Sequence, residues 1–475
     1  MSPSNFALHL ITACFAGFAS FCVSAQTSPV STATILPVSP AAADMWRAAS
    51  RLGYAPAPEA AALVSSLASR VLALQNIEAA HLASRQAPDI PSELVRINAP
   101  LNDIVRDFHT EREARKALPA RAASAVTMST AEAAPVVNVF SREMAQSAAA
   151  WRVVSCSNPA LENPLLARMT EFWFNHLNVY DGKNLVRPFI GHYLINVIRA
   201  NARHPAMLFY LDQAQSNIRG INENYARELM ELHTLGVNGG YSQNDVHELA
   251  RILTGWTVIL PAGEGFRFSE RLHDKGSKTF MGQSYASNGV AEGEDAIRYL
   301  ARQPATAHRI AARLATFFVA DNPPAARVQR LEKTFLDTQG DLRVVMRALV
   351  ASPEFWAPGS QLFKTPMDFA CSALTAGGGV KDRRDVVQAL GFLSQAGQPV
   401  YGWQTPDGYP TDAATWMAPE ALTRRADFAF YLAPRMREPD YLNAFLSPAT
   451  QARIVREPAK ARAGLMLASP DFMRK

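Results

Sequence analysis

The sequence predicts a mainly α-helical globular protein built from many helices, with one small β-hairpin or ribbon insertion. Three observations predict this fold. Apolar residues recur at spacings of three and four along most of the chain after residue 45. Proline opens several of these segments, where its missing N–H has no intrahelical partner to lose. Only residues 258–293 change character, with many glycines and the alternating Phe266-Arg267-Phe268.

The N-terminus predicts an export signal. Residues 10–23 form an apolar run that is short for a membrane span, and Val23-Ser24-Ala25 forms a small-x-small cleavage pattern. We therefore expect a signal peptide over residues 1–25 and a protein exported to the periplasm or the cell exterior. Residues 26–43 are rich in Ser, Thr, Pro and Ala and predict a flexible spacer. Beyond the signal peptide, we expect no transmembrane segment.

Residues 44–475 form the predicted helical domain. Clear helical patterns occupy residues 59–83 and 93–118 near its start. The β insertion falls at about 258–293, after which helical patterns resume. A further expectation is a C-terminal helical lobe over about 360–475.

Composition limits the class of protein and of partner. Hydrophobic residues make up 48% and charged residues 19% of the 475 residues, which is typical of a folded globular protein. The net charge is +5, but the arginines alternate with acids and form no basic run, so the sequence predicts no nucleic-acid partner. After signal removal two cysteines remain, Cys156 and Cys371, which either pair or stay as buried free thiols.

The most informative pattern lies in residues 222–256, NENYARELMELHTLGVNGGYSQNDVHELARILTGW. It predicts a helix, a glycine turn and a second helix. The first helix begins at the polar cluster of residues 222–224 and ends before Gly236, which suits the left-handed turn of a helix end. The second helix begins at Ser242, with Asp245 three residues on in a capping-box arrangement.

This stretch resembles the signature of the bacterial family catalogued as domain of unknown function 1800. Residues 172–176, 204–207 and 468–472 agree with the same family. The resemblance runs from about Arg51 to the C-terminus and implies one family-like helical domain over nearly the whole mature chain. It implies no activity, because the family has no established one. Members are often encoded beside a second exported family of unknown function, which implies a co-exported partner.

One edge of the first signature helix carries more acid than its neighbours can neutralise. Glu223, Arg227 and Glu231 follow each other at i, i+4 and predict a ladder of ion pairs. Glu228 has no basic partner on its own helix and lies with Asn224 and Glu231 within about 60° of arc. The two carboxylates of this oxygen-rich edge repel each other unless a cation from another segment neutralises them.

The sequence leaves three explanations of this edge open. A structural cation, Arg187, Arg251 or Lys278, would neutralise Glu228. A hard divalent ion such as Ca²⁺ or Mg²⁺ would bind its oxygens. In the third explanation Glu228 acts as an acid–base residue, and Glu231 adjusts its pKa or binds a cation. No His-x-x-x-His or Glu-x-x-His pattern occurs, so the cofactor stays unknown, and a divalent metal has no strong motif.

Glu228, Glu231 and His233 are the predicted catalytic residues. His233 falls on the apolar face of the helix, where a buried core histidine is the alternative explanation. The predicted substrate-binding residues are Arg251, His273, Asp274 and Lys278. Three of these four stand in the glycine-rich insertion, where side chains are not used by a helix core. The alternative for this segment is a plain turn formed by its Asp and Gly residues.

Together these patterns predict an exported hydrolase or lyase with a carboxylate, histidine and arginine site at the paired signature helices. The alternative is a non-catalytic envelope protein that acts with a co-exported partner, in which the same residues form a buried polar network. Phosphate loops, dinucleotide fingerprints and the Gly-x-Ser-x-Gly nucleophile motif do not occur in the sequence.

Overall fold

A computed structural model describes residues 37–56, 66–117, 138–183, 185–197 and 202–475. The predicted signal peptide 1–25 and most of the predicted spacer lie outside these residues. Helix α2 (Pro40–Arg51) begins within the stretch predicted as spacer, because the Ser39 side chain accepts a hydrogen bond from Ala42 N–H and Pro40 occupies the first turn.

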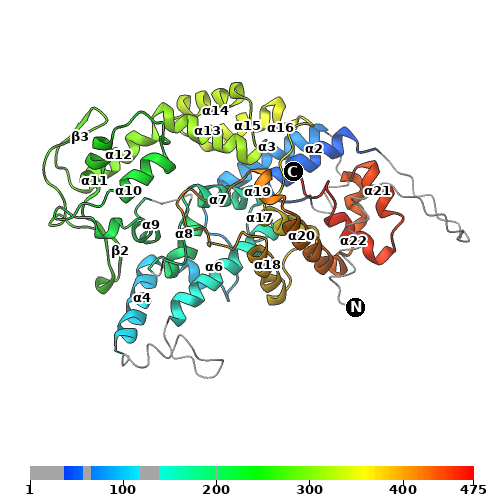
Figure 1. Cartoon of the computed structure of the whole chain (residues 1–475), viewed down its shortest axis with the longest axis horizontal. Helices are drawn as coiled ribbons and strands as arrows, with labels where there is room; N and C mark the ends of the chain where they lie inside the picture. The colour runs from blue at the N-terminus through cyan, green and yellow to red at the C-terminus, as the bar shows by residue number, and fades with distance from the viewer. Residues whose placement is uncertain (1–36, 57–65, 118–137, 184, 198–201) are drawn as a thin grey trace, which may run out of the picture.

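The described chain is mainly α-helical, as the sequence predicts (Figure 1). After α2 the helices are α3 (Ser66–Ala83), α4 (Leu101–Lys116), α6 (Val139–Ser157), α7 (Pro164–His176), α8 (Ile190–Asn196), α9 (Pro205–Tyr210), α10 (Asn224–Glu228), α11 (Gln243–Leu253), α12 (Val290–Ala301), α13 (Pro304–Phe318), α14 (Ala325–Asp337), α15 (Leu342–Ala351), α16 (Pro353–Trp356), α17 (Pro366–Ala376), α18 (Arg383–Gln395), α19 (Ala413–Trp416), α20 (Pro419–Leu432), α21 (Pro448–Ile454) and α22 (Ala459–Leu467). Among the described residues, no helix has both the length and the apolar character needed to cross a bilayer.

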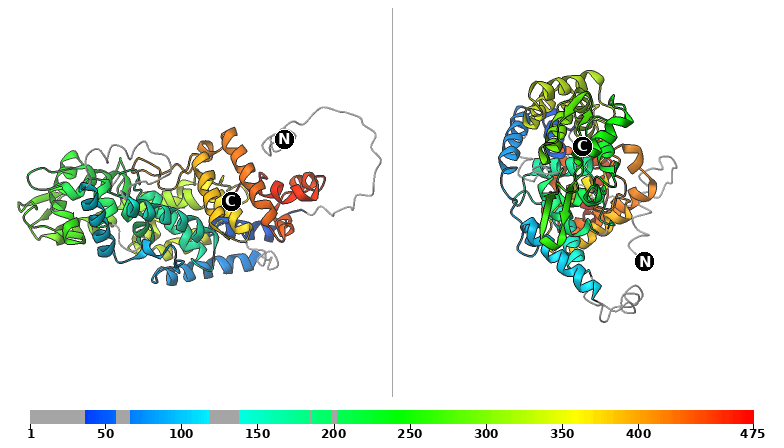
Figure 2. Two further views of the ribbon diagram at one scale, coloured as in Figure 1. Left: turned by 90° about the horizontal axis from the view of Figure 1, so that it is seen from below. Right: turned by 90° about the vertical axis from the view of Figure 1, so that its left-hand side faces the viewer.

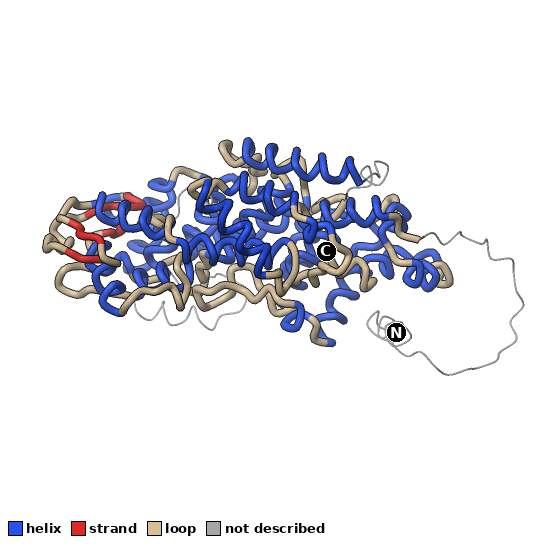
Figure 3. Tube along the Cα trace, turned by 90° about the horizontal axis from the view of Figure 1, so that it is seen from above, coloured by secondary structure: helices blue, strands red, loops and turns tan. Residues whose placement is uncertain are grey.

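The β structure is confined to two small antiparallel hairpins. Strands β1 (Trp256–Ile259) and β2 (Glu264–Phe268) form the first, and β3 (Lys278–Phe280) and β4 (Gln283–Tyr285) form the second. Trp256 pairs with Phe268, and the register shifts between β1 residues 257 and 259. The strands gather at one end of the molecule (Figure 3), so the small β insertion predicted near 258–293 is confirmed.

Three hydrophobic clusters meet at helix α7, and the first two also include residues of α6. The first surrounds Trp151 and Trp256 and unites α4, α6 and α8 to α12. The second joins α2 and α6 to α17, α18, α20 and α22, the helices of the predicted lobe 360–475. The third joins α3 and α7 to α13, α14 and α15. The molecule is elongated, with the hairpins at one end and α21 and α22 at the other (Figure 2).

A disulfide links Cys156 of α6 to Cys371 of α17, with 5.6 Å between the two Cα atoms. The sequence does not decide between a disulfide and two free thiols, and the structure contains the disulfide. The bond joins segments 215 residues apart in sequence. It therefore fixes α17 against α6.

Candidate functional site

The first signature helix leaves regular α geometry directly after Glu228. Helix α10 (Asn224–Glu228) continues as a π-helical segment, η5 (Leu229–His233). The segment ends where Gly236 N–H donates to Met230 O at 3.0 Å, with Gly236 at a left-handed φ of 89°. π-Helical turns are rare and occur often at functional sites. The sequence predicts a plain α-helix here, so the π-helical segment is a correction to that prediction.

The ion-pair ladder predicted on this helix is confirmed. Arg227 pairs with Glu223 at 3.1 Å and with Glu231 at 3.4 Å. All three side chains are partly exposed, so each pair contributes a few tenths of a kcal/mol. Glu231, one of the predicted catalytic residues, is therefore held by an arginine of its own helix.

Glu228 is half-buried and has no hydrogen bond or ion pair with any described residue. Burial raises its pKa, and the nearby carboxylate of Glu231 raises it further. Arg227 opposes this rise, and Asp407 adds to it. A carboxylate with these surroundings takes up a proton more readily than a free glutamate.

The prediction that a structural cation neutralises Glu228 is wrong for the residues named. Arg251 pairs with Glu248 at 2.8 Å and with Asp274 at 2.7 Å. Lys278 pairs with a buried glutamate of α12, and Arg187 makes no ion pair with Glu228. The helical wheel cannot show which acids these cations meet, because their partners come from other segments.

Two arginines of α13 supply positive charge behind the signature helix. Arg309 Nε donates to Leu232 O at 2.9 Å. Arg313 is partly buried and has no hydrogen bond or ion pair with any described residue; burial lowers its pKa to about 10, and Arg309 contributes to this fall. Asp407 opposes that fall, so it lies within electrostatic reach of both Arg313 and Glu228.

The sequence analysis missed these two arginines. They stand four residues apart, on one face of the otherwise apolar PATAHRIAARLATFF helix. A pair of charges at this spacing is the signal that could have identified them.

The turn-rich loop after α18 brings Asp407 to this place. Asn178 Nδ2 donates to Trp403 O at 3.1 Å and to Thr405 O at 2.8 Å. Tyr210 OH donates to the backbone oxygen of residue 404 at 2.7 Å. These bonds hold the loop against the end of α7 and against α9. Glu228 in turn helps to raise the pKa of Tyr210, after burial itself.

His233 is buried and lies apart from the Glu228 edge. It lines an apolar cavity of about 230 Å³ together with Trp173 and Leu229. Its backbone oxygen accepts from His176 Nε2 at 3.0 Å, and its own Nε2 has no hydrogen-bond partner among the described residues. Burial lowers the pKa of His233 to about 3, with a further contribution from Arg309. No hydrogen bond joins His233 to Glu228 among the described residues.

The four predicted substrate-binding residues fall into two bonded groups. In the first, Arg251 joins Glu248 of α11 to Asp274, and the bond to Arg251 lowers the pKa of Asp274. Glu248 also accepts from Thr279 N–H at 2.8 Å. Gly276 N–H donates to Asp274 Oδ1 at 2.8 Å, which forms the turn that the sequence analysis kept as an alternative.

The second group is buried. Lys278 pairs with Glu292 at 2.8 Å and lies 3.4 Å from His273 Nε2. His273 Nδ1 lies 2.8 Å from Thr254 O, and Asn288 N–H donates to Glu292 at 2.7 Å. The two groups join α11, β3 and α12. In the described part of the chain neither group bonds to Glu228, so a substrate-binding role for these four residues stays a prediction.

Within the described part of the chain, no three His, Cys, Asp or Glu side chains are grouped so that they could hold a metal ion. The Glu228 edge therefore consists of an unpaired carboxylate with Glu231 and Asp407 within electrostatic reach. Arg309 bonds the backbone of the same segment, and Arg313 lies within electrostatic reach of Asp407.

Comparison with known proteins gives one result. The family model described as Protein of unknown function (DUF1800) matches residues 47–474. No curated protein and no solved structure matches the chain.

Proposed function

The chain belongs to this family of unknown function, and from that premise we propose that it is an exported hydrolase or lyase in which Glu228 is the general acid or base. The observation that carries the proposal is the state of Glu228. It is a half-buried carboxylate without a partner among the described residues, placed at the start of a π-helical segment. Arg251 and Lys278 pair with other acids, so this carboxylate is not used in an ion pair with either of them.

The surroundings of Glu228 suit proton transfer. Burial and the Glu231 carboxylate raise its pKa toward the range in which acid–base residues work at neutral pH. The ion pair with Arg227 at 3.4 Å holds the Glu231 carboxylate in this position near Glu228. His233 has no part in the proposed chemistry, because its depressed pKa keeps it neutral and uncharged.

The proposal moves the anion-holding role to α13. Arg251 and Lys278 are already paired with acids of their own surroundings. Arg313 is free of such a partner among the described residues, so its guanidinium is the one available to hold a substrate anion or a developing negative charge. Arg309 adds positive charge beside it.

Export is the second part of the proposal. It rests on the cleavage pattern of residues 1–25, and the disulfide between Cys156 and Cys371 supports it. Disulfides persist in oxidising compartments such as the periplasm and are rare in the reducing cytosol.

The test is a substrate panel of chromogenic esters, glycosides and phosphates, with uronate polysaccharides to report lyase cleavage. For any substrate that the purified protein turns over, Glu228→Gln is expected to lower kcat by about 10²- to 10⁴-fold, the usual contribution of an acid–base residue. Glu223→Gln makes the same chemical change five residues earlier, at a member of the ion-pair ladder, and is expected to keep the activity. An activity that Glu228→Gln retains in full would contradict the proposal.

A second candidate is a non-catalytic envelope protein that binds a co-exported partner. The observation that favours it is an exposed apolar face on α3, where Leu67 is 74%, Val71 44% and Leu74 42% exposed. A photo-crosslinking residue at position 67, expressed in the native envelope, should join the chain to one discrete exported protein. Loss of that adduct in Val71→Glu, with no effect of Glu228→Gln, would favour this candidate over the enzyme.

A further inference from the structure

The apolar cavity of about 230 Å³ beside His233 lies between the first and the third hydrophobic cluster. Its wall includes Met207 of α9 and Leu229 of η5 from the first cluster, and Ile310 of α13 and Phe335 of α14 from the third. These four side chains are almost fully buried. The cavity therefore extends into the interior of the protein, where two cores meet.

The polar side chains in the wall of this cavity have nothing to offer a ligand. Tyr225 OH donates to a main-chain oxygen at 2.8 Å. The Thr234 and Thr306 hydroxyls donate to main-chain oxygens at 2.6 Å and 2.7 Å. Trp173 Nε1 and His233 Nε2 have no hydrogen-bond partner among the described residues, but less than 1 Å² of each atom is accessible, so neither can meet a molecule in the cavity. No described side chain of the wall therefore has a free donor or a charge for a ligand.

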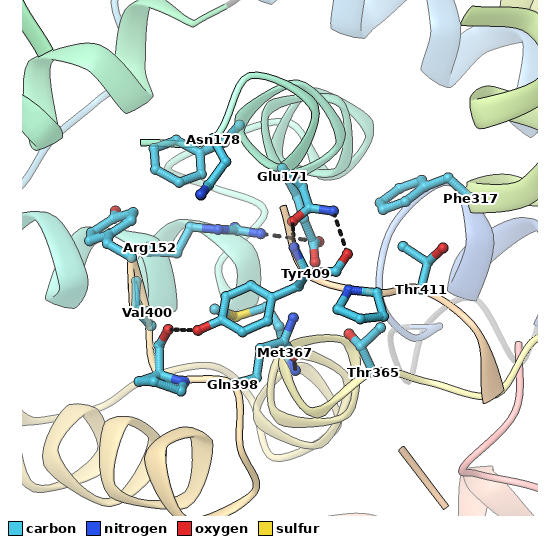
Figure 4. Close-up of a pocket in the computed structure, with 15 residues that line it drawn as sticks. Arg152, Glu171, Asn178, Phe317, Thr365, Met367, Gln398, Val400, Tyr409 and Thr411 are labelled. Atoms are coloured by element: carbon cyan, nitrogen blue, oxygen red, sulfur yellow. Dashed lines mark hydrogen bonds and ion pairs between the residues drawn. The ribbon is translucent and has the colours of Figure 1, made fainter. Parts of the chain in front are cut away.

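A second cavity, of about 60 Å³, has a different wall (Figure 4). Its lining includes a charged pair, Arg152 and Glu171, which lie 3.0 Å apart and are joined by a dashed line in Figure 4. It has room for only a few water-sized groups. The cavity beside His233 is larger and has no such ion pair among its described lining residues, so it suits a different class of molecule.

The larger cavity opens to solvent at the end of α12. Ala301, the last residue of this helix, is exposed, and Ile297 one turn earlier is partly exposed. Both residues also line the cavity. Side chains that meet both solvent and the cavity mark its mouth, so a molecule can lie with one end inside and the other end in water.

We propose that this cavity binds an acyl or alkyl chain of medium length, with the polar end of the molecule left in water near Ala301. An apolar cavity of about 150 Å³ in a protein stays dry and takes up benzene, so a cavity of about 230 Å³ has room for about nine carbon atoms. A chain of this size removes its own apolar surface from water and gives the wall the contacts that it lacks.

The chemistry of the wall excludes other classes of ligand. A sugar or a peptide would bring polar groups that lose their hydrogen bonds to water and find no free donor in the described wall. A charged group inside the cavity would meet no counter-ion among the described lining residues. Glu228 is not among these lining residues either, so binding of a chain does not depend on the acid–base role of Glu228.

Isothermal titration calorimetry with sodium alkanoates from butanoate to dodecanoate tests the size of the cavity, each salt being used below its micelle concentration. Each added methylene should tighten binding about four-fold until the chain reaches about nine carbon atoms. Further carbons should add nothing, because they stay outside the mouth. 1-Octanol should bind within a few-fold of octanoate, since the polar end lies in water. Octanedioate should not bind, because it would place a carboxylate in a wall without free donors.

Ala301→Trp tests the position of the mouth. An indole at this exposed position covers the entrance without entering the core, and it should weaken the binding of octanoate about ten-fold or more, as for the loss of two buried methylenes. Ala459→Trp is the matched control. It makes the same change at an exposed alanine at the end of another helix, α22, which lies at the opposite end of the molecule from the hairpins (Figure 2), and it should bind octanoate as the wild type does.

Two ligands separate the possible sources of the chain. Octanoate represents a free fatty acid, and monomeric dioctanoyl phosphatidylcholine represents a membrane lipid; binding of either supports the proposal, and binding of neither overturns it. Three further results would also overturn it: octanedioate binding as tightly as octanoate, an affinity that keeps rising up to dodecanoate, and equal binding of octanoate to Ala301→Trp and Ala459→Trp. Glu228→Gln should bind octanoate as the wild type does, so failure of chain binding and failure of the proposed acid–base role can be told apart.

Discussion

Removal of the Cys156–Cys371 disulfide should destabilise the fold by an amount that follows from its sequence span. The bond closes a loop of 215 residues. The chain-entropy relation gives about 5 kcal/mol for a loop of this length, as an upper value. With an unfolding entropy of about 2.1 cal/mol/K per residue over roughly 440 residues, this free energy corresponds to a fall in melting temperature of about 6 °C.

The assay is scanning calorimetry of the wild type and of Cys156→Ala/Cys371→Ala, each with and without a phosphine reductant. The double variant should melt about 6 °C below the oxidised wild type and should not respond to reductant. The wild type, unfolded and refolded in reductant, should match the double variant. Equal melting temperatures for the oxidised wild type and the double variant would refute the reasoning, since the cross-link would then do nothing to the unfolded chain.

Three further predictions concern stability. Burial lowers the pKa of four histidines, His233 to about 3 and His192 to about 4, with His176 and His204 well below 6.5. The unfolded chain therefore takes up protons before the folded chain does as pH falls below 6.5. Urea titrations should show the free energy of unfolding falling by up to about 1.4 kcal/mol per pH unit per histidine between pH 6.5 and 5. Lys278→Met should cost about 3–5 kcal/mol by stranding Glu292, and adding Glu292→Leu should recover part of it; full additivity would contradict the pairing. Ser242→Ala should cost about 1 kcal/mol in denaturant unfolding because it removes a helix cap, and no loss would contradict that role.

Much of the signature stretch could be predicted because its interactions are local. Ser242 and Asp245 form the predicted capping box, with both reciprocal bonds present. Arg227 bonds the two acids four residues away on either side. Such contacts depend only on helix spacing, which the sequence contains.

The features that decide the candidate site depend on contacts between distant segments. The π-helical segment ends where Gly236 N–H donates to Met230 O, and no composition rule predicts it. The loop that carries Asp407 comes within electrostatic reach of Glu228, although almost two hundred residues separate the two in sequence. The buried ion pair of Arg168 with Asp368 joins α7 to α17 across 200 residues. Periodicity identifies which helices form, but it does not identify which helices meet.

The measurement that tests the central claim most directly is the difference in unfolding free energy between the wild type and Glu228→Gln from pH 4 to pH 8. The folded pKa of Glu228 lies above its ordinary 4.5, so ionising this carboxylate opposes folding. The account predicts that Glu228→Gln is the more stable protein at pH 7 and that its advantage disappears as pH falls toward 4. A Glu228→Gln variant that is clearly less stable than the wild type at pH 7 would contradict it and would make Glu228 a member of a structural network.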